Sequence, residues 1–173
     1  HSEGWHTSAS NMASHAEGAY TKTREFYSHA EGVYTFAGGI GSHAEGYYTS
    51  TSLDANHAHA EGIETKAFAS GSHSEGDDTI TLGMSSHAEG SRTSASGTYS
   101  HAEGVANEAL GVGSHAEGNS NTSSGTYSHV EGKLNFAISS GSHAEGLSNL
   151  IELKALYAHA EGYLNTASAA YSH

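Results

Sequence analysis

The chain has 173 residues, a mass of 17.8 kDa and a formal net charge of −13, with only six Lys and Arg. It lacks Cys, which excludes disulfides, Cys-ligated zinc and a Cys nucleophile. The scattered basic residues form no stripe for nucleic acid, and no apolar run approaches the roughly 18 residues of a membrane span. The charged fraction of 14% is also low for a chain kept disordered by solvation.

A five-residue motif, Ser-His-Ala-Glu-Gly, recurs nearly unchanged along the whole chain, in steps of 14 residues apart from two steps of 16. Such steps are too short for a pair of helices and suit one coil of a β-solenoid, with two short strands joined by tight turns. We therefore expect an all-β solenoid of twelve coils, a single repeat array over residues 1–173 cut from a longer fibre. The coils begin at His1, His15, His29, His43, His59, His73, His87, His101, His115, His129, His143 and His159.

The first strand of each coil is predicted over the motif itself. Alternation along a strand places Ser and Ala on one face and His and Glu on the other, so that stacked coils form columns of His and Glu. We expect these structural polar columns to consist of His15, Glu17, His29, Glu31, His43, Glu45, His59, Glu61, His73, Glu75, His87, Glu89, His101, Glu103, His115, Glu117, His129, Glu131, His143, Glu145, His159 and Glu161.

A Gly ends every copy of the motif. A turn that needs positive φ, or a close approach of two backbones, explains a Gly at this place. The predicted turn residues are Gly18, Gly32, Gly46, Gly62, Gly76, Gly90, Gly104, Gly118, Gly132, Gly146 and Gly162.

A column of Thr, and then of Asn, stands six residues after each His. Stacked identical polar side chains can hydrogen-bond in a ladder with a spacing of about 4.8 Å, and we expect both residue types to point inward. Two residues later the positions are mostly small or β-branched, which predicts the second strand. The ladder positions are Thr7, Thr21, Thr35, Thr49, Thr65, Thr79, Thr93, Asn107, Asn121, Asn135, Asn149 and Asn165.

The second turn is predicted at Gly39, Gly83, Gly97, Gly111 and Gly125. Two residues before the His, Tyr and Gly dominate, which suggests graded packing around a shared surface. The two 16-residue coils carry their extra residues around Leu53 to His57 and Leu153 to Tyr157, where we expect enlarged turns outside the ladder. The larger side chains, such as Trp5, Tyr47 and Tyr48, follow the motif Gly and are available for an outer or inter-chain surface.

The whole repeat resembles the head repeats of trimeric autotransporter adhesins of the Yersinia-adhesin type, which also occur in phage tail fibres. Those repeats carry Ser-Val-Ala-Ile-Gly where this chain has Ser-His-Ala-Glu-Gly. The resemblance implies a left-handed parallel β-roll, a homotrimeric rod with no catalytic site, and an extracellular location on a bacterial cell surface or a phage particle.

The departure from the family pattern replaces an apolar chain-to-chain surface by His and Glu. Because buried charges need partners, we expect a hydrogen-bonded polar zipper along the trimer interface. The alternative is that His and Glu face solvent. If each interface His is protonated and paired with Glu, its pKa is raised; if it is buried as the neutral ring, its pKa is lowered.

Three catalytic or metal interpretations are weak. His-Ala-Glu resembles the first motif of zinc deaminases, but the required Pro-Cys-x-x-Cys partner is missing. Twelve copies of a Ser-His-Glu set indicate a scaffold, since catalysis needs one cleft. Imidazole columns suit Zn, Ni or Cu, yet such binding would be repetitive and unspecific. We therefore expect neither an enzyme nor a cofactor.

Two functions stay open. The first is an adhesive fibre segment that binds the host extracellular matrix or a cell-surface receptor. The second is a structural stalk or self-assembling filament without a ligand of its own. The expected partner in both is a further copy of the chain; neither nucleic acid nor direct membrane insertion is expected.

Overall fold

The computed structural model describes residues 1–173 and contains no helix, hence none that could cross a membrane. The chain forms a parallel β-solenoid of twelve coils, as the repeat predicts. Each coil provides one strand of four or five residues at the motif and one strand of two residues after it. The coils fall into two compact units of six, unit 1 (His1–Ser86) and unit 2 (His87–His173).

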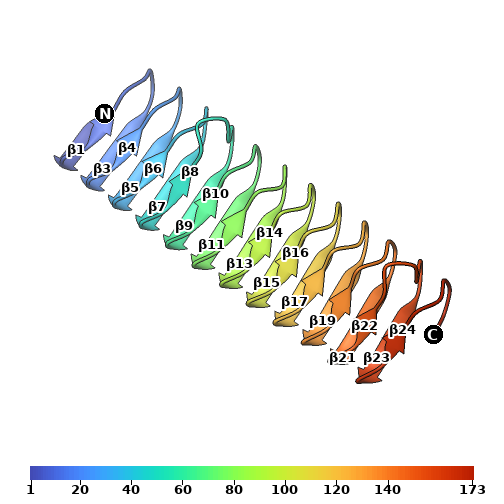
Figure 1. Cartoon of the computed structure of the whole chain (residues 1–173). Helices are drawn as coiled ribbons and strands as arrows, with labels where there is room; N and C mark the ends of the chain where they lie inside the picture. Colours follow the sequence, from blue (N-terminus) through green and yellow to red (C-terminus); the bar gives the residue numbers. More distant parts are fainter. The chain divides into compact units, whose positions relative to one another are not determined.

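In each unit the longer strands form one parallel sheet and the shorter strands form a second (Figure 1). The strands of unit 1 are β1 (Ser2–Trp5), β2 (Ser8–Ala9), β3 (His15–Ala19), β4 (Lys22–Thr23), β5 (His29–Val33), β6 (Phe36–Ala37), β7 (His43–Tyr47), β8 (Ser50–Thr51), β9 (His59–Ile63), β10 (Lys66–Ala67), β11 (His73–Asp77) and β12 (Ile80–Thr81). Those of unit 2 are β13 (His87–Ser91), β14 (Ser94–Ala95), β15 (His101–Val105), β16 (Glu108–Ala109), β17 (His115–Asn119), β18 (Thr122–Ser123), β19 (His129–Lys133), β20 (Phe136–Ala137), β21 (His143–Leu147), β22 (Leu150–Ile151), β23 (His159–Tyr163) and β24 (Thr166–Ala167).

The interior of every coil is narrow and is filled by small side chains. Ala30 in β5 and Ala37 in β6 are fully buried, and so is nearly all of Ser28, which precedes the motif His. The largest fully buried apolar side chains are Ile151 and Val130. One coil therefore buries little apolar surface, and most of its order comes from backbone hydrogen bonds to the next coil.

The motif Gly lies inside the longer strand, two residues before the turn that we expected it to make. Gly32 has φ 111°, and a Cβ on it would lie 2.1 Å from the carbonyl oxygen of Gly46 in the next coil. Positive φ and close approach both require Gly here. The turn itself uses Tyr34, two residues later, with φ 58°.

The second turn lies where the Gly pattern predicts it, but close approach rather than positive φ explains those Gly. A Cβ on Gly97 would lie 1.9 Å from the carbonyl oxygen of Gly111. Ser100, which opens the next motif, closes this turn: its Oγ donates a 2.7 Å hydrogen bond to the carbonyl oxygen of Gly97. The first letter of the repeat is therefore a turn residue.

The column of Tyr and Gly before the motif has positive φ throughout, which explains why Gly recurs there. Gly also makes room for an aromatic ring in the following coil. A Cβ on Gly113 would lie 2.7 Å from the Tyr127 ring, and one on Gly141 would lie 2.5 Å from the Tyr157 ring. Large and small residues at this column thus complement one another from coil to coil.

The enlarged turns leave the strand register intact, because His43 still pairs with His59 and His143 with His159. Only part of each segment lies outside the ladder. Leu53 is 51% exposed, whereas Ala55 is fully buried and its carbonyl oxygen accepts from the Ala58 amide, as the second-turn Gly does in a standard coil. The expectation of a loop outside the ladder is thus wrong for the residues from Ala55 onward.

Candidate functional site: the His-Glu face

The longer strands turn their His and Glu side chains outward, away from the Ala and Ser that fill the coil. Parallel pairing places His29 beside His43 and Glu31 beside Glu45. The side chains of His43 and Glu45 are 35% and 38% exposed. We call the outer surface made by these columns, in each unit, the His-Glu face. The structure thus brings the predicted columns together in register on one face.

The imidazole rings stack along the column. In unit 1 the ring centroids from His15 to His73 are 4.7–4.9 Å apart with interplanar angles of 8° or less. In unit 2 those from His87 to His159 are also 4.7–4.9 Å apart, with angles of 4° or less. Rings so close together disfavour protonation of neighbours, since each added charge repels the next.

Burial and stacking lower the pKa of several His rings in the columns. Desolvation lowers the pKa of the His43 ring, and the neighbouring His59 lowers it further, against the opposing effect of Glu45. The pKa of His115 is lowered in the same way by burial and by His129 and His101. This direction is opposite to that of a protonated zipper. The pKa is lowered at His29, His43, His59, His87, His115 and His143.

The Glu side chains make different contacts in the two units. In unit 1 each Glu approaches the His of its own strand: Oε2 of Glu45 lies 3.4 Å from Nε2 of His43. In unit 2 the Glu approaches the His of the next coil: Oε1 of Glu103 lies 3.7 Å from Nε2 of His115. These contacts have ion-pair distances, and the Nε2 atoms of His43 and His129 are buried without a hydrogen bond.

Glu side chains at successive rungs of unit 2 influence one another's ionisation. Interaction with Glu103 and Glu131 raises the pKa of Glu117 to about 7. Interaction with the neighbouring Glu lowers the pKa of Glu103 and of Glu131. Carboxyls at successive rungs cannot all ionise cheaply, and the column therefore shares protons.

The Asn residues of the predicted ladder hydrogen-bond from coil to coil. Asn121 is fully buried; its Nδ2 donates to the carbonyl oxygens of Glu117 (2.5 Å) and Gly132 (2.8 Å). Its Oδ1 accepts a 2.8 Å hydrogen bond from the amide of Asn135, which repeats the pattern in the next coil. The Asn column thus ties neighbouring coils together through side chain and backbone.

The Thr part of the ladder is buried but does not hydrogen-bond up the column. The Oγ1 atoms of Thr21, Thr35, Thr49 and Thr65 have no hydrogen-bond partner. Three Thr of the column bond within their own coil instead, and one of them is Thr7, which contacts Ser2 at 2.6 Å. Thr79 contacts Ser74 at 2.8 Å, and Thr93 donates to the carbonyl oxygen of Glu89 at 3.1 Å. The Thr side chains from Thr21 to Thr93 are therefore buried and form no hydrogen-bonded ladder from coil to coil.

The stacked geometry also limits metal binding by one chain. Ligand atoms of His59, Glu61 and His73 lie within 4.8 Å of one another. The His59 and His73 rings are parallel, however, with an interplanar angle of 0°. Imidazole lone pairs lie in the ring plane, so those of parallel stacked rings do not converge on one ion. The column therefore offers His ligands one at a time.

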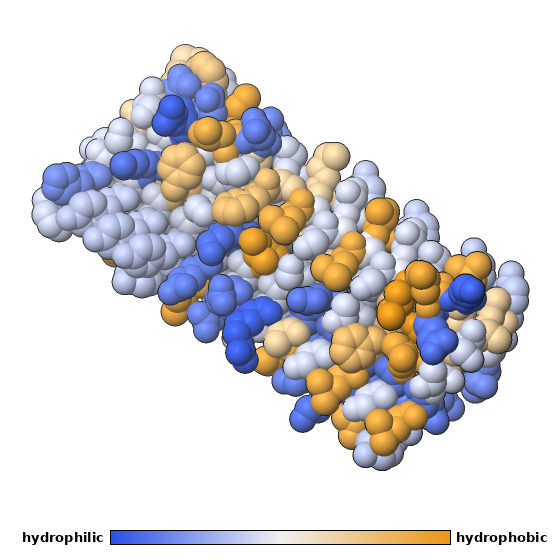
Figure 2. Space-filling view, viewed as in Figure 1, coloured by the Kyte–Doolittle hydropathy of each residue, from blue (hydrophilic) through white to orange (hydrophobic).

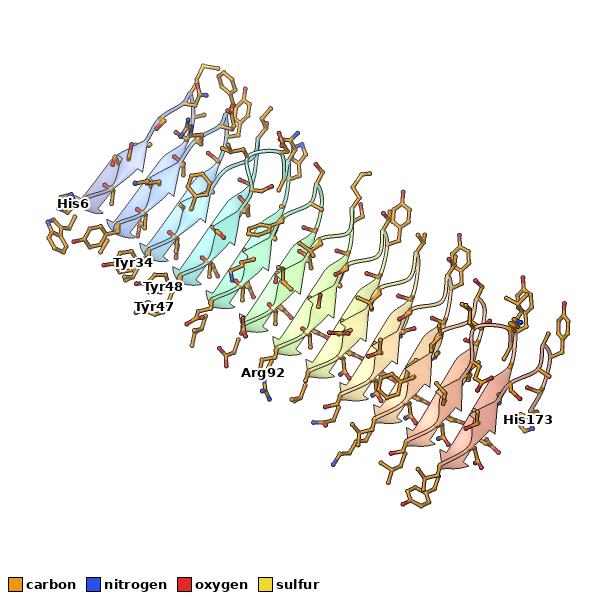
Figure 3. All side chains as sticks on the ribbon, in the orientation of Figure 1. His6, Tyr34, Tyr47, Tyr48, Arg92 and His173 are labelled. Atoms are coloured by element: carbon orange, nitrogen blue, oxygen red, sulfur yellow. The ribbon has the colours of Figure 1, made fainter.

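Unit 1 has a second surface feature, a stack of aromatic rings that the sequence pattern did not predict. Tyr20, Tyr34 and Tyr48, at the turn after each longer strand, stack with centroids 4.6 and 4.7 Å apart and interplanar angles of 4° and 11°. His6 continues the stack beyond Tyr20 at 5.1 Å. Figure 3 shows His6, Tyr34 and Tyr48 in a row at the tips of the longer strands. Aromatic letters recurring at one repeat position were the available signal.

The chain was compared with known proteins. No protein-family model matches the sequence, and no curated protein matches it significantly.

Proposed function

We propose that the chain is a structural and adhesive segment of an extracellular fibre, on a bacterial cell surface or a phage particle. In this proposal three parallel chains form left-handed rolls around one axis and meet through their His-Glu faces, while the outer surface binds host or surface ligands. The alternative is a stalk or filament that has no ligand of its own.

The His-Glu face carries the proposal. It repeats one pair of residues in register at every coil, and the Nε2 atoms of His43, His59 and His129 are buried there without a hydrogen bond. A further chain that presents the same columns offers donors and acceptors for these atoms, and burying them without partners would be unfavourable. The thin Ala-filled coil supports association as well, because narrow repeats gain burial from neighbours.

Sedimentation equilibrium with a charged variant tests the proposal. The native chain should have a mass three times the chain mass of 17.8 kDa. His115→Glu adds a charge to the proposed interface and should shift the equilibrium to monomer. Thr122→Glu is the matched control on the other sheet of the same coil, where the neighbouring strand already carries Glu108. A folded native monomer, or equal dissociation of both variants, would contradict the interface.

Solid-phase binding separates the two functions. An adhesive segment should be retained on immobilised collagen, fibronectin or whole cells in a saturable manner, whereas a pure stalk should not be. The control is the same chain unfolded in denaturant and applied after dilution, since exposed aromatic side chains can adhere unspecifically.

A further inference from the structure

The stack formed by His6, Tyr20, Tyr34 and Tyr48, which we call the aromatic column, ends at a small hollow. The next residue of this column is Glu64, in the coil after Tyr48, and Lys66 begins the adjoining strand β10. Tyr48, Glu64 and Lys66 line a hollow of about 300 Å³. This volume is at the lower end of small-molecule sites and matches one small ring rather than an extended ligand.

The position of Tyr48 in the stack makes it the aromatic wall of the hollow. Tyr34 covers one face of the Tyr48 ring at 4.7 Å, so the opposite face points along the column toward the coil of Glu64. Tyr47 packs perpendicular to Tyr48 at 4.6 Å and helps to fix the ring. Tyr48 is nevertheless 46% exposed. The column therefore presents a rigid ring at this end, held by two neighbours.

The polar side chains of the hollow are unengaged. Glu64 and Lys66 make no ion pair with each other or with any other residue, and neither side chain has a hydrogen bond. An ionised carboxylate only accepts hydrogen bonds and an ammonium only donates them. A ligand between them can satisfy both if it carries groups that donate and accept, as hydroxyls do.

We propose that this hollow binds a neutral pyranose, as a single sugar unit of a glycan. The electron-rich face of a Tyr ring attracts the weakly positive C–H groups on the apolar face of a pyranose. The ring hydroxyls donate to Glu64 and accept from Lys66. The proposal names a ligand class for the outer surface of the proposed fibre and rests on that function, but the site itself lies within one chain.

Other ligand classes fit less well. A cation would be drawn to the Tyr48 face and to Glu64 but repelled by Lys66. An acidic sugar would pair with Lys66 but would be repelled by Glu64. Asp77 and Asp78 in the following coil would add to this repulsion. The net charge of −13 opposes a polyanion such as nucleic acid. A neutral polyhydroxy compound avoids these conflicts.

Saturation-transfer NMR on the full chain tests the site with maltotriose and triacetylchitotriose as probes. One saccharide should receive transfer, and Tyr48→Ala should weaken its binding about tenfold or more, because the stacking surface is lost. Tyr48→Phe keeps the ring face and should keep binding. Ala fits the backbone at this position, since Ala106 stands at the same place of its coil with φ 54°.

Leu164→Ala is the matched control, because Leu164 occupies the equivalent position with φ 57° and is likewise exposed. It should leave binding unchanged. The proposal is overturned by the absence of transfer to both saccharides at tens of millimolar, by equal binding in Tyr48→Ala, or by binding of tetramethylammonium alone. Failure of the sugar site would leave the trimer mass unaffected, which distinguishes it from failure of the proposed fibre.

Discussion

The two units share one repeat and one strand register, yet different residues fill the same buried column. In unit 1 the column is Thr throughout, and several of its hydroxyls have no partner. In unit 2 the column is Asn from Asn107 onward, and the amides join each coil to the next. The backbone follows this difference: the motif Gly has φ 110° to 114° in unit 1 and 97° to 103° in unit 2.

The units also differ on the outward face of the longer strand, and this difference begins at Glu89, one coil before the first Asn. In unit 2 each Asn amide holds the carbonyl oxygens of its own Glu and of the next coil's Gly, the peptides that flank the outward Glu side chain. The Glu side chains of unit 2 also contact different His from those of unit 1. The interior residue and the exterior carboxyl contacts therefore change within one coil of each other. The surface view shows apolar side chains among polar ones on both units (Figure 2).

The largest effect is expected from Asn121→Leu in unit 2. The substitution removes three hydrogen bonds and leaves the Asn135 amide and two carbonyl oxygens buried without that partner. Because each unsatisfied buried group costs roughly 1–3 kcal/mol, we expect a loss of about 3 kcal/mol or more in the free energy of unfolding. Urea denaturation followed by circular dichroism measures it.

Ser120→Leu is the neighbouring control for this variant. Ser120 lies at the turn surface with φ 57°, and Leu134 and Leu164 already occupy the same position with the same φ. Its cost should stay below about 1 kcal/mol. Equal losses in the two variants would mean that the Asn ladder contributes nothing specific to unit 2.

A change of pH should affect the free energy of unfolding in opposite directions through the His column and through Glu117. A lowered His pKa means that the unfolded chain binds more protons, so the His contribution is complete above the unfolded pKa of about 6.5 and declines as the pH falls below it. Glu117, with a pKa raised to about 7, acts in the opposite sense: its contribution is complete at low pH and is lost as the pH rises through about 7.

Carbon-13 NMR of Glu-labelled protein measures the carboxyl titration directly, with Glu117→Gln to assign the signal. If the Glu117 carboxyl titrates near its ordinary pKa of 4.5, the Glu side chains of unit 2 do not share protons. A melting series across the same pH range tests the His: increasing stability as the pH falls from 7 to 5 would show that they gain protons on folding.

A smaller effect is expected from the enlarged turns, one of which lies in each unit. Deleting Leu53 and Asp54 removes an exposed segment and joins Ser52 to Ala55, as Ser96 joins Gly97 in a standard coil. The deletion removes two hydrogen bonds to the carbonyl oxygen of Asp54, one from the Ser70 hydroxyl and one from the Asn56 amide. The cost should be below about 1 kcal/mol, since loop length has a small entropic effect.

Ala55→Leu is the contrasting variant, because it places a large side chain at a fully buried site. Overpacking there should cost about 1–3 kcal/mol in the same denaturation experiment. If the deletion is the more harmful of the two, the residues Leu53 and Asp54 belong to the packed coil after all.

The repeat period predicted the coil, both strands, the inward Ala and Ser, and the outward His and Glu, because strand alternation and stacking depend only on spacing. It could not predict the turn geometry. Gly32 indicated a turn residue, yet the left-handed position falls on Tyr34, where the letter varies from coil to coil. Because many residue types occupy this positive-φ position, no single residue type marks the turn in the sequence.

The sequence predicted the strand face of each side chain better than it predicted the hydrogen-bond partner of that side chain. The Thr and Asn columns look equivalent in sequence, but only an amide has both a donor and an acceptor long enough to reach the next coil. The direction of the His pKa was also beyond the reach of spacing: burial and the neighbouring His59 ring lower the pKa of His43 against the opposing effect of Glu45. Alternative side-chain conformations at one rung are invisible to spacing.

The smallest effect should come from Thr49→Val in unit 1. The Thr49 hydroxyl is buried, and its Oγ1 has no hydrogen-bond partner, so valine of nearly the same shape removes a desolvated polar group without removing a bond. We expect the free energy of unfolding to change by less than about 0.5 kcal/mol, or to rise slightly. Thr93→Val is the matched variant in unit 2, where the hydroxyl donates to the Glu89 carbonyl oxygen at 3.1 Å, and it should cost about 1 kcal/mol. Urea denaturation of the pair measures the difference. A Thr49→Val loss as large as that of Thr93→Val would show that the Thr49 hydroxyl has a partner, and the contrast between the Thr and Asn columns would narrow accordingly.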